Sequence, residues 1–96
     1  MIPVLFEREA LAEALDAFDW YEERQPGLGL RFRDALRVAV ERIADNPSQF
    51  PVQYRNVRRV VLDRFPYAVY YRAYPSHASV VAVFHGKRSP KTLQQR

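Results

Sequence analysis

The sequence predicts a single α+β domain in which a helical hairpin packs on one face of a small antiparallel sheet. The first half contains a short apolar run followed by two stretches of helical periodicity, and a Pro/Gly-rich break separates these two stretches. The second half contains three runs of β-branched and aromatic residues joined by short connections, which predicts a β-meander. The expected order is β-α-α-β-β-β. A chain of 96 residues has room for one core, so residues 1–96 form one domain.

The predicted first strand, Ile2–Phe6, is followed directly by the first helix. Pro3 has no backbone donor, which places the start of this strand at a sheet edge or outside the ladder. From Arg8 to residue 24 the apolar residues recur with the period of a helix and form one stripe, which we expect to face the core. The stripe consists of Leu11, Ala14, Leu15, Phe18 and Tyr21.

The second predicted helix begins at about Leu28, after Pro26 and Gly27 have interrupted the first. So short a link makes the two helices an antiparallel hairpin. The second helix ends near residue 46, because the residue before Pro47 avoids the helical region. Residues 47–51 then form a compact turn, in which Phe50 is expected to fill the seam between helices and sheet. The apolar face of this helix is Phe32, Ala35, Leu36, Ala39, Val40 and Ile43.

The three strands of the meander are predicted at Val57–Leu62, Tyr67–Tyr74 and Ser79–His85. Side chains alternate between the two faces of a sheet, so each strand can be divided between them. The more apolar set is assigned to the helix side: Val60, Leu62, Tyr67, Val69, Tyr71, Val80, Ala82 and Phe84. The opposite face has no remaining element to cover it. It is expected to carry Arg59, Tyr70, Arg72 and the strand-end His85, with Arg64, Lys87 and Arg88 at its rims.

Charge is distributed unevenly along the chain, which has a formal net charge of +4 and thirteen arginines among its fifteen basic residues. Residues 7–23 hold seven acids and only Arg8 as a base, whereas residues 55–96 hold nine bases and only Asp63 as an acid. The guanidinium group suits phosphates and carboxylates. The second half, with Arg58 among its bases, therefore predicts a surface for an anionic partner, either nucleic acid or an acidic peptide.

Several functional classes are disfavoured by what the sequence lacks. Cysteine is absent, and no Cys/His cluster or Gly-rich loop indicates a metal or a nucleotide, so we expect neither metal nor cofactor. No apolar run has the length of a signal peptide core or a membrane span, which favours a cytoplasmic protein without a membrane partner. Trp20 lies about half a turn from the helix stripe. We expect it to pack on the helix connection, the alternative being an exposed anchor for a partner.

The phrases DWYEERQPGLGLRFRDAL, ADNPSQFP, RRVVLDRFPYAVYYR and VFHGKRSP resemble the RelE/ParE superfamily, the toxins of type II toxin–antitoxin modules. The resemblance extends over roughly Val4 to Pro90 and is closer to the ParE-like branch. It implies a small basic toxin that is neutralised by a cognate antitoxin. Such an antitoxin has a DNA-binding part and a flexible segment that wraps the toxin, so contact with operator DNA is expected only through the antitoxin.

The resemblance also bears on the target, because RelE-like toxins cut messenger RNA on the ribosome whereas ParE-like toxins poison DNA gyrase. This chain keeps Arg59 and Arg88 at positions resembling the basic residues of RelE-like toxins. It has Val61 and Ala68 where further basic residues would lie, and it lacks the carboxy-terminal Tyr. We therefore expect a non-enzymatic gyrase inhibitor. A ribosome-dependent endoribonuclease using Arg59, Arg88 and His85 remains an alternative, as does a non-toxic partner in operator autoregulation.

Overall fold

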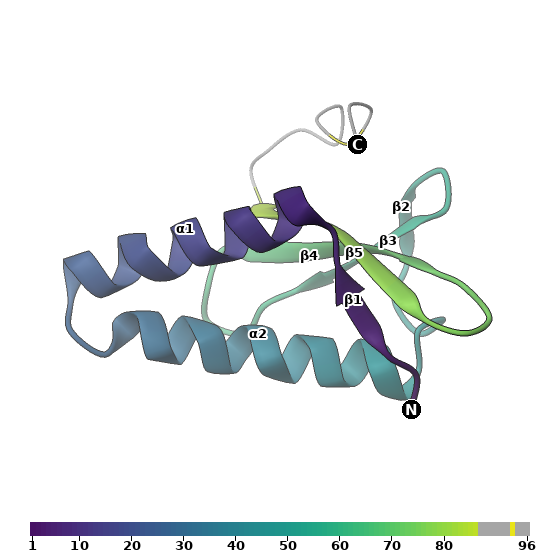
Figure 1. Cartoon of the computed structure of the whole chain (residues 1–96), viewed down its shortest axis with the longest axis horizontal. Coiled ribbons are helices and arrows are strands. Elements are labelled where there is room, and N and C mark those ends of the chain that lie inside the picture. Colours follow the sequence, from purple (N-terminus) through teal and green to yellow (C-terminus); the bar gives the residue numbers. More distant parts are fainter. Residues whose placement is uncertain (87–92, 94–96) are drawn as a thin grey trace.

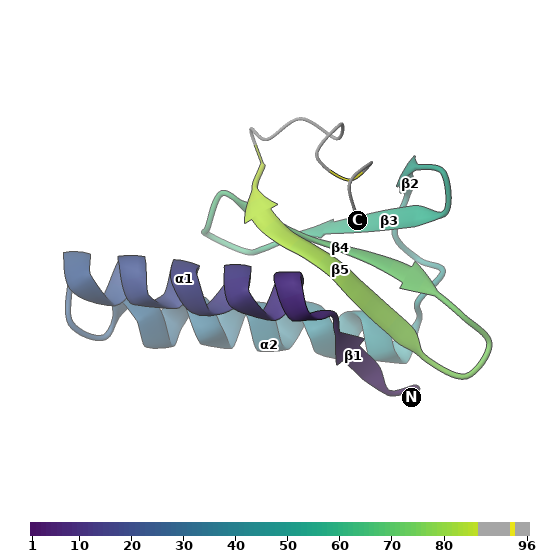
Figure 2. The same ribbon diagram turned by 45° about the horizontal axis from the view of Figure 1, so that its top comes forward.

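The computed structural model describes residues 1–86 and residue 93, and it confirms the α+β class. Two antiparallel helices pack on one face of a twisted sheet (Figures 1 and 2). The predicted helical hairpin and the three strands of the meander are present, with ends that differ from the predicted ones by one residue or none. The elements are β1 (Val4–Phe6), α1 (Arg8–Arg24), α2 (Leu28–Asp45), β2 (Val52–Tyr54), β3 (Val57–Val61), β4 (Tyr67–Ala73) and β5 (Ala78–His85).

The sheet has five strands in the order β1-β5-β4-β3-β2 and is mixed rather than wholly antiparallel. β1 runs parallel to β5, with Val4 opposite Ala78 and Phe6 opposite Val80. No hairpin joins these two strands, so chain connectivity does not impose an antiparallel arrangement on them. β1 is an edge strand, as Pro3 predicted, and the Pro3 carbonyl accepts a hydrogen bond of 3.0 Å from the Ala78 amide.

β2, a strand of three residues at the opposite edge of the sheet, was not predicted from the sequence. It pairs with β3 across a tight turn in which Arg55 has a positive φ of 50°. A strand this short shows no usable alternation, and its pairing depends on β3. Phe50, just before β2, is half-buried against the main core, which confirms its predicted place in the seam between helices and sheet.

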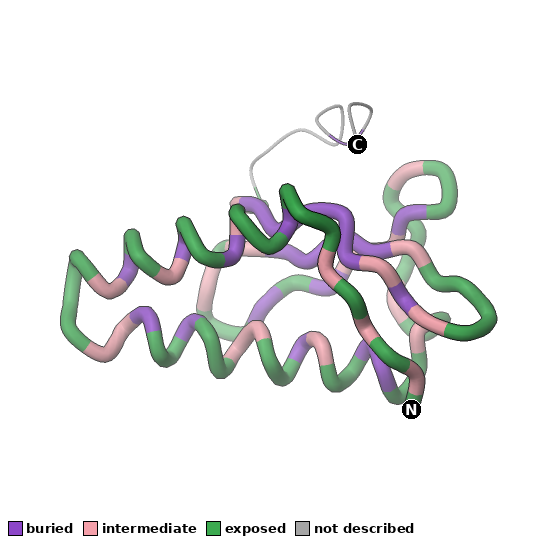
Figure 3. The backbone as a smooth tube through the Cα atoms, viewed as in Figure 1, coloured by how far each residue is buried: buried purple, intermediate pink, exposed green. Residues whose placement is uncertain are grey.

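The buried side of α1 differs from the predicted stripe. Leu11 and Leu15 are 49% and 57% exposed, so their assignment to the core is wrong. Small residues dominate the side that packs on α2 and β5, because short side chains let the helix approach its neighbours closely. In Figure 3 the buried positions of α1 recur on its inner side. They are Ala10, Ala14, Ala17 and Tyr21.

A bulge in β5 changes the faces that the alternation predicted. Tyr70 lies opposite Ala82 and Tyr71 lies opposite Val80, which leaves Val81 as an additional residue. Strict alternation fails at such a bulge. Ala82 and Phe84 therefore belong to the cluster on the face away from the helices and not, as expected, to the helix side.

Buried clusters lie on both faces of the sheet. The larger one joins the helices to the sheet and includes the stacked rings of Tyr21 and Phe32, whose centroids are 5.4 Å apart. The smaller one, called here the second core, lies on the opposite face. Its members are Val57, Ala68, Tyr70, Val81, Ala82, Phe84 and Leu93, with Tyr54 packed against them. The expectation that nothing covers this face is wrong, because Leu93 near the carboxy terminus is buried there.

Candidate functional site

The predicted open face retains two arginines but not the tyrosine between them. Tyr70 is only 1% exposed, with its ring centroid 5.0 Å from that of Phe84, so its placement on an accessible surface is wrong. Arg59 pairs with Tyr70, and Arg72 pairs with Val57, so both arginines lie on the face of the second core. Both side chains are half-buried. A cationic surface therefore remains around a hydrophobic interior.

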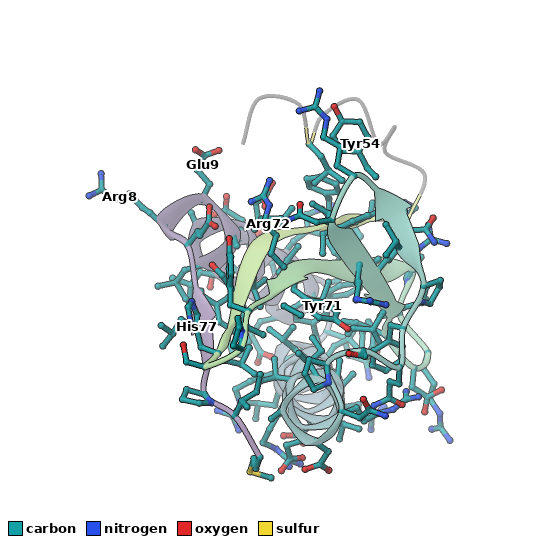
Figure 4. The ribbon with its side chains drawn as sticks, turned by 90° about the vertical axis from the view of Figure 1, so that its right-hand side faces the viewer. Arg8, Glu9, Tyr54, Tyr71, Arg72 and His77 are labelled. Atoms are coloured by element: carbon teal, nitrogen blue, oxygen red, sulfur yellow. The ribbon has the colours of Figure 1, made fainter. Side chains whose placement is uncertain are left out.

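Arg72 is held by groups from two neighbouring segments. Its Nε donates a hydrogen bond of 3.2 Å to Asn56 Oδ1, and its Nη1 lies 4.0 Å from Glu7 Oε2. The same Glu7 oxygen accepts a hydrogen bond of 3.1 Å from Ser79 Oγ. Figure 4 shows Arg72 and Tyr71 on opposite sides of the sheet. Glu7 thus brings an acid to the predicted cationic face, where none was expected from the sequence.

Arg58 points to the helix side and holds the loop that follows α2. Its Nη1 donates hydrogen bonds to the carbonyl oxygens of Phe50, at 2.6 Å, and Ser48, at 3.1 Å. The adjacent Tyr71 hydroxyl donates to the Pro47 carbonyl at 2.6 Å. Burial raises the pKa of Tyr71, and the nearby Arg58 partly opposes that rise. Arg58 was expected at a binding surface, but these contacts give it a structural role.

The remaining predicted binding residues are dispersed. Arg64 is exposed in the turn between β3 and β4, where it has a positive φ of 68°. Trp20 is 48% exposed, with one ring contact to Tyr21 and the Arg24 guanidinium 4.2 Å from its ring centroid. It is therefore a surface residue more than a packing residue of the helix connection. Lys87 and Arg88 lie outside the described residues.

His85 lies on the helix side of the sheet, away from Arg59. It pairs with Tyr67, and the two ring centroids are 5.7 Å apart. Tyr67 packs against the larger core, whereas Arg59 shares the opposite face with Tyr70. Among the described residues, the structure therefore does not bring Arg59 and His85 together as the endoribonuclease alternative would require, while Arg88, the other candidate cation, lies outside the described part.

His85 instead lines a groove between α1 and the end of β5, which we call the α1–β5 groove. Its volume is about 670 Å³, and Glu13, Asp16 and Trp20 line it from α1. This groove was not predicted from the sequence. The spacing of these three residues, i, i+3 and i+7, places them on one side of a helix, a signal that could have indicated a shared surface. Their meeting with His85 depends on the packing of α1 on β5.

The described part of the chain shows neither a metal-binding cluster nor a membrane-spanning helix. Residues 1–86 and 93 contain no cluster of three or more His, Cys, Asp or Glu side chains able to hold a metal ion. Neither described helix combines the length and apolarity that a membrane span requires.

The fold and the family match together place the protein among the small toxins of type II toxin–antitoxin systems. Residues 4–90 match the family described as "ParE toxin of type II toxin-antitoxin system, parDE". The protein belongs to that family. Its structure is similar to a chain of the chromosomal ParDE toxin–antitoxin system from P. aeruginosa, with a TM-score of 0.77 and 19% sequence identity. That similarity, which supports the fold, covers 88% of this chain and 96% of the other. A search of curated proteins found no match.

Proposed function

We propose that this ParE-family protein is a cytoplasmic toxin that inhibits DNA gyrase and is neutralised by a cognate antitoxin. Membership of the ParE toxin family supports the toxin class and the existence of an antitoxin partner. The observation that favours gyrase over messenger RNA is the separation of Arg59 from His85 by the sheet. Contact with operator DNA would occur through the antitoxin.

The separation matters because RNA cleavage requires three chemical groups close together. A base must remove the proton of the 2′-hydroxyl, an acid must protonate the leaving oxygen, and a cation must stabilise the phosphorane. Arg59 could serve as the cation, but on its face Tyr70 is buried and Glu7 accepts a hydrogen bond from Ser79. Inhibition by surface contact requires no proton transfer, so it fits these residues better than cleavage does.

The antitoxin is expected to contact exposed apolar residues as well as the cationic face. Leu11 and Leu15, one turn apart on α1, are 49% and 57% exposed, and Leu5 of the edge strand β1 is 57% exposed. Apolar surface of this kind favours a partner that brings its own apolar side chains. An amphipathic segment of the antitoxin would cover these leucines, and its acids would approach Arg59 and Arg72.

Two assays distinguish the targets. In one, purified protein is added to gyrase with supercoiled plasmid; in the other, it is added to ribosomes programmed with a message. We expect gyrase inhibition with trapped DNA breaks and an intact message. Cleaved message with unaffected gyrase would support the ribonuclease alternative, and no effect on either would support a partner that acts only in operator control.

The antitoxin contact can be tested with the product of an adjacent antitoxin-like gene. Leu15→Glu should weaken the complex by at least about tenfold, because a charge would replace a buried apolar contact. Val38→Glu is the matched control, since Val38 is 45% exposed on α2. Equal weakening by both variants would contradict this placement.

A further inference from the structure

The α1–β5 groove lies outside the surfaces that the proposed function uses. It lies where β5 continues past the end of β1, so that α1 rather than a strand flanks β5 (Figure 1). Glu13 Oε1 accepts a hydrogen bond of 3.0 Å from the Val83 amide and thereby links the helix to the strand. This link fixes one wall of the groove relative to the other.

The walls combine aromatic rings with carboxylates. Tyr67 and Tyr21 contribute aromatic surface, and Ala17 lines the groove with a small side chain. Trp20 lines the same groove and is about half exposed. The Asp16 side chain is exposed and forms no hydrogen bond or ion pair with any other described residue. An apolar groove bordered by two acids is thus present on a protein whose overall charge is +4.

We propose that the α1–β5 groove binds an arginine-bearing segment of a protein partner. Its volume of about 670 Å³ falls in the range of about 300–1,000 Å³ typical of binding pockets, enough for one long side chain and its neighbours. The guanidinium would meet the Asp16 carboxylate, with Glu13, whose Oε1 accepts the Val83 amide hydrogen bond, beside it. Its aliphatic stem would lie against Tyr67 and Trp20, and the Arg24 guanidinium already lies 4.2 Å from the Trp20 ring centroid.

Charge complementarity selects this occupant over others. A nucleic acid or acidic peptide would bring negative charge against Glu13 and Asp16, which opposes binding. A purely apolar segment would displace water from the Asp16 carboxylate without supplying a positive charge in its place. Arginine is favoured over lysine because its planar group can stack on an aromatic ring while it donates to carboxylates.

The proposal can be tested by tryptophan fluorescence. Trp20 is the single tryptophan of the chain and lines the groove, so a change in its emission reports binding at this place. The probe is a blocked tripeptide with a central arginine, and the control peptide carries citrulline, an uncharged analogue of the same shape. Saturable change of the Trp20 signal with the arginine peptide, and an affinity at least about threefold weaker with citrulline, would support the proposal.

Three variants complete the test. Asp16→Asn and Glu13→Gln should each weaken the arginine peptide by about three- to tenfold, and Gln at position 13 keeps an oxygen acceptor for the Val83 amide. Asp19→Asn is the control, because it removes the same charge from an exposed position of α1 that does not line the groove. Absence of saturable binding, equal response to both peptides, or equal effects of Asp16→Asn and Asp19→Asn would overturn the proposal. The outcome is independent of whether gyrase is the target.

Discussion

Arg59 and His85 lie on opposite faces of the same sheet. Arg59 is opposite Tyr70, whose ring is buried in the second core, and His85 is opposite Tyr67, whose ring packs against the helices. In the sequence both residues belong to the basic carboxy-terminal half, and both were candidates for one catalytic group. Their separation supports the proposal that toxicity rests on surface contact, and this leads to the first prediction.

His85→Gln should leave growth inhibition and gyrase inhibition within about twofold of the original protein, because the proposed inhibition by surface contact requires no proton transfer. In a ribonuclease that used His85 as acid or base, the same change would reduce the rate by about 10²–10⁴-fold. Growth of cells expressing the variant, together with the plasmid assay, measures the effect. A loss of that larger size would contradict the non-enzymatic proposal.

Arg58→Ala should destabilise the fold, because it removes the donor to the Ser48 and Phe50 carbonyls. We expect the free energy of unfolding to fall by about 1–2 kcal/mol, measured by urea denaturation. Arg59→Ala, one residue further along β3, is the matched control and should change stability by about 0.5 kcal/mol or less. Equal losses in the two variants would show that Arg58 has no special structural role.

Gly29→Ala should weaken the helical hairpin, because a Cβ at this position would lie 2.7 Å from the Phe18 carbonyl oxygen and 2.9 Å from Glu22 Oε1. The same Glu22 oxygen accepts the Gly29 amide hydrogen bond at 3.0 Å. The backbone of α1 has little freedom to move away, so a loss of about 1–3 kcal/mol is expected in thermal or urea unfolding.

The control for this variant is Gly86→Ala. A Cβ there would meet the Pro66 carbonyl oxygen at an ordinary contact distance of 3.6 Å. If both alanine variants were as stable as the original protein, the close approach of α1 and α2 at Gly29 would not limit the packing.

Stability should decrease at alkaline pH because burial, together with the neighbouring Tyr67, raises the pKa of Tyr21 above its usual value near 10. As pH rises above about 10, unfolded Tyr21 loses its proton while folded Tyr21 retains it, so the unfolded state is favoured. The free energy of unfolding therefore keeps its full value below about pH 10 and decreases above it. Urea unfolding at a series of pH values should show a smaller decline for Tyr21→Phe; an identical decline would exclude Tyr21 as a cause.

The sequence by itself determined the elements whose signals are local. Pro26 and Gly27 separate the two helices, whose observed bounds, Arg8–Arg24 and Leu28–Asp45, follow the predicted ones closely. The meander was predicted from β-branched and aromatic runs. A helical period and a turn residue act within a few positions of the chain, so these features can be identified without knowledge of the fold. The phrases that resemble the toxin superfamily were equally visible in the sequence.

Tertiary structure decided which side chains face which neighbours. The bulge at Val81 moved Ala82 and Phe84 to the second core, and the close packing of α1 selected its alanines instead of Leu11 and Leu15. The parallel pairing of β1 with β5, the short strand β2 and the burial of Tyr70 likewise depend on segments far apart in the sequence. Pairing between distant segments sets the strand register, and the space between elements decides which side chains are buried. Neither can be read from the local periodicity of apolar residues.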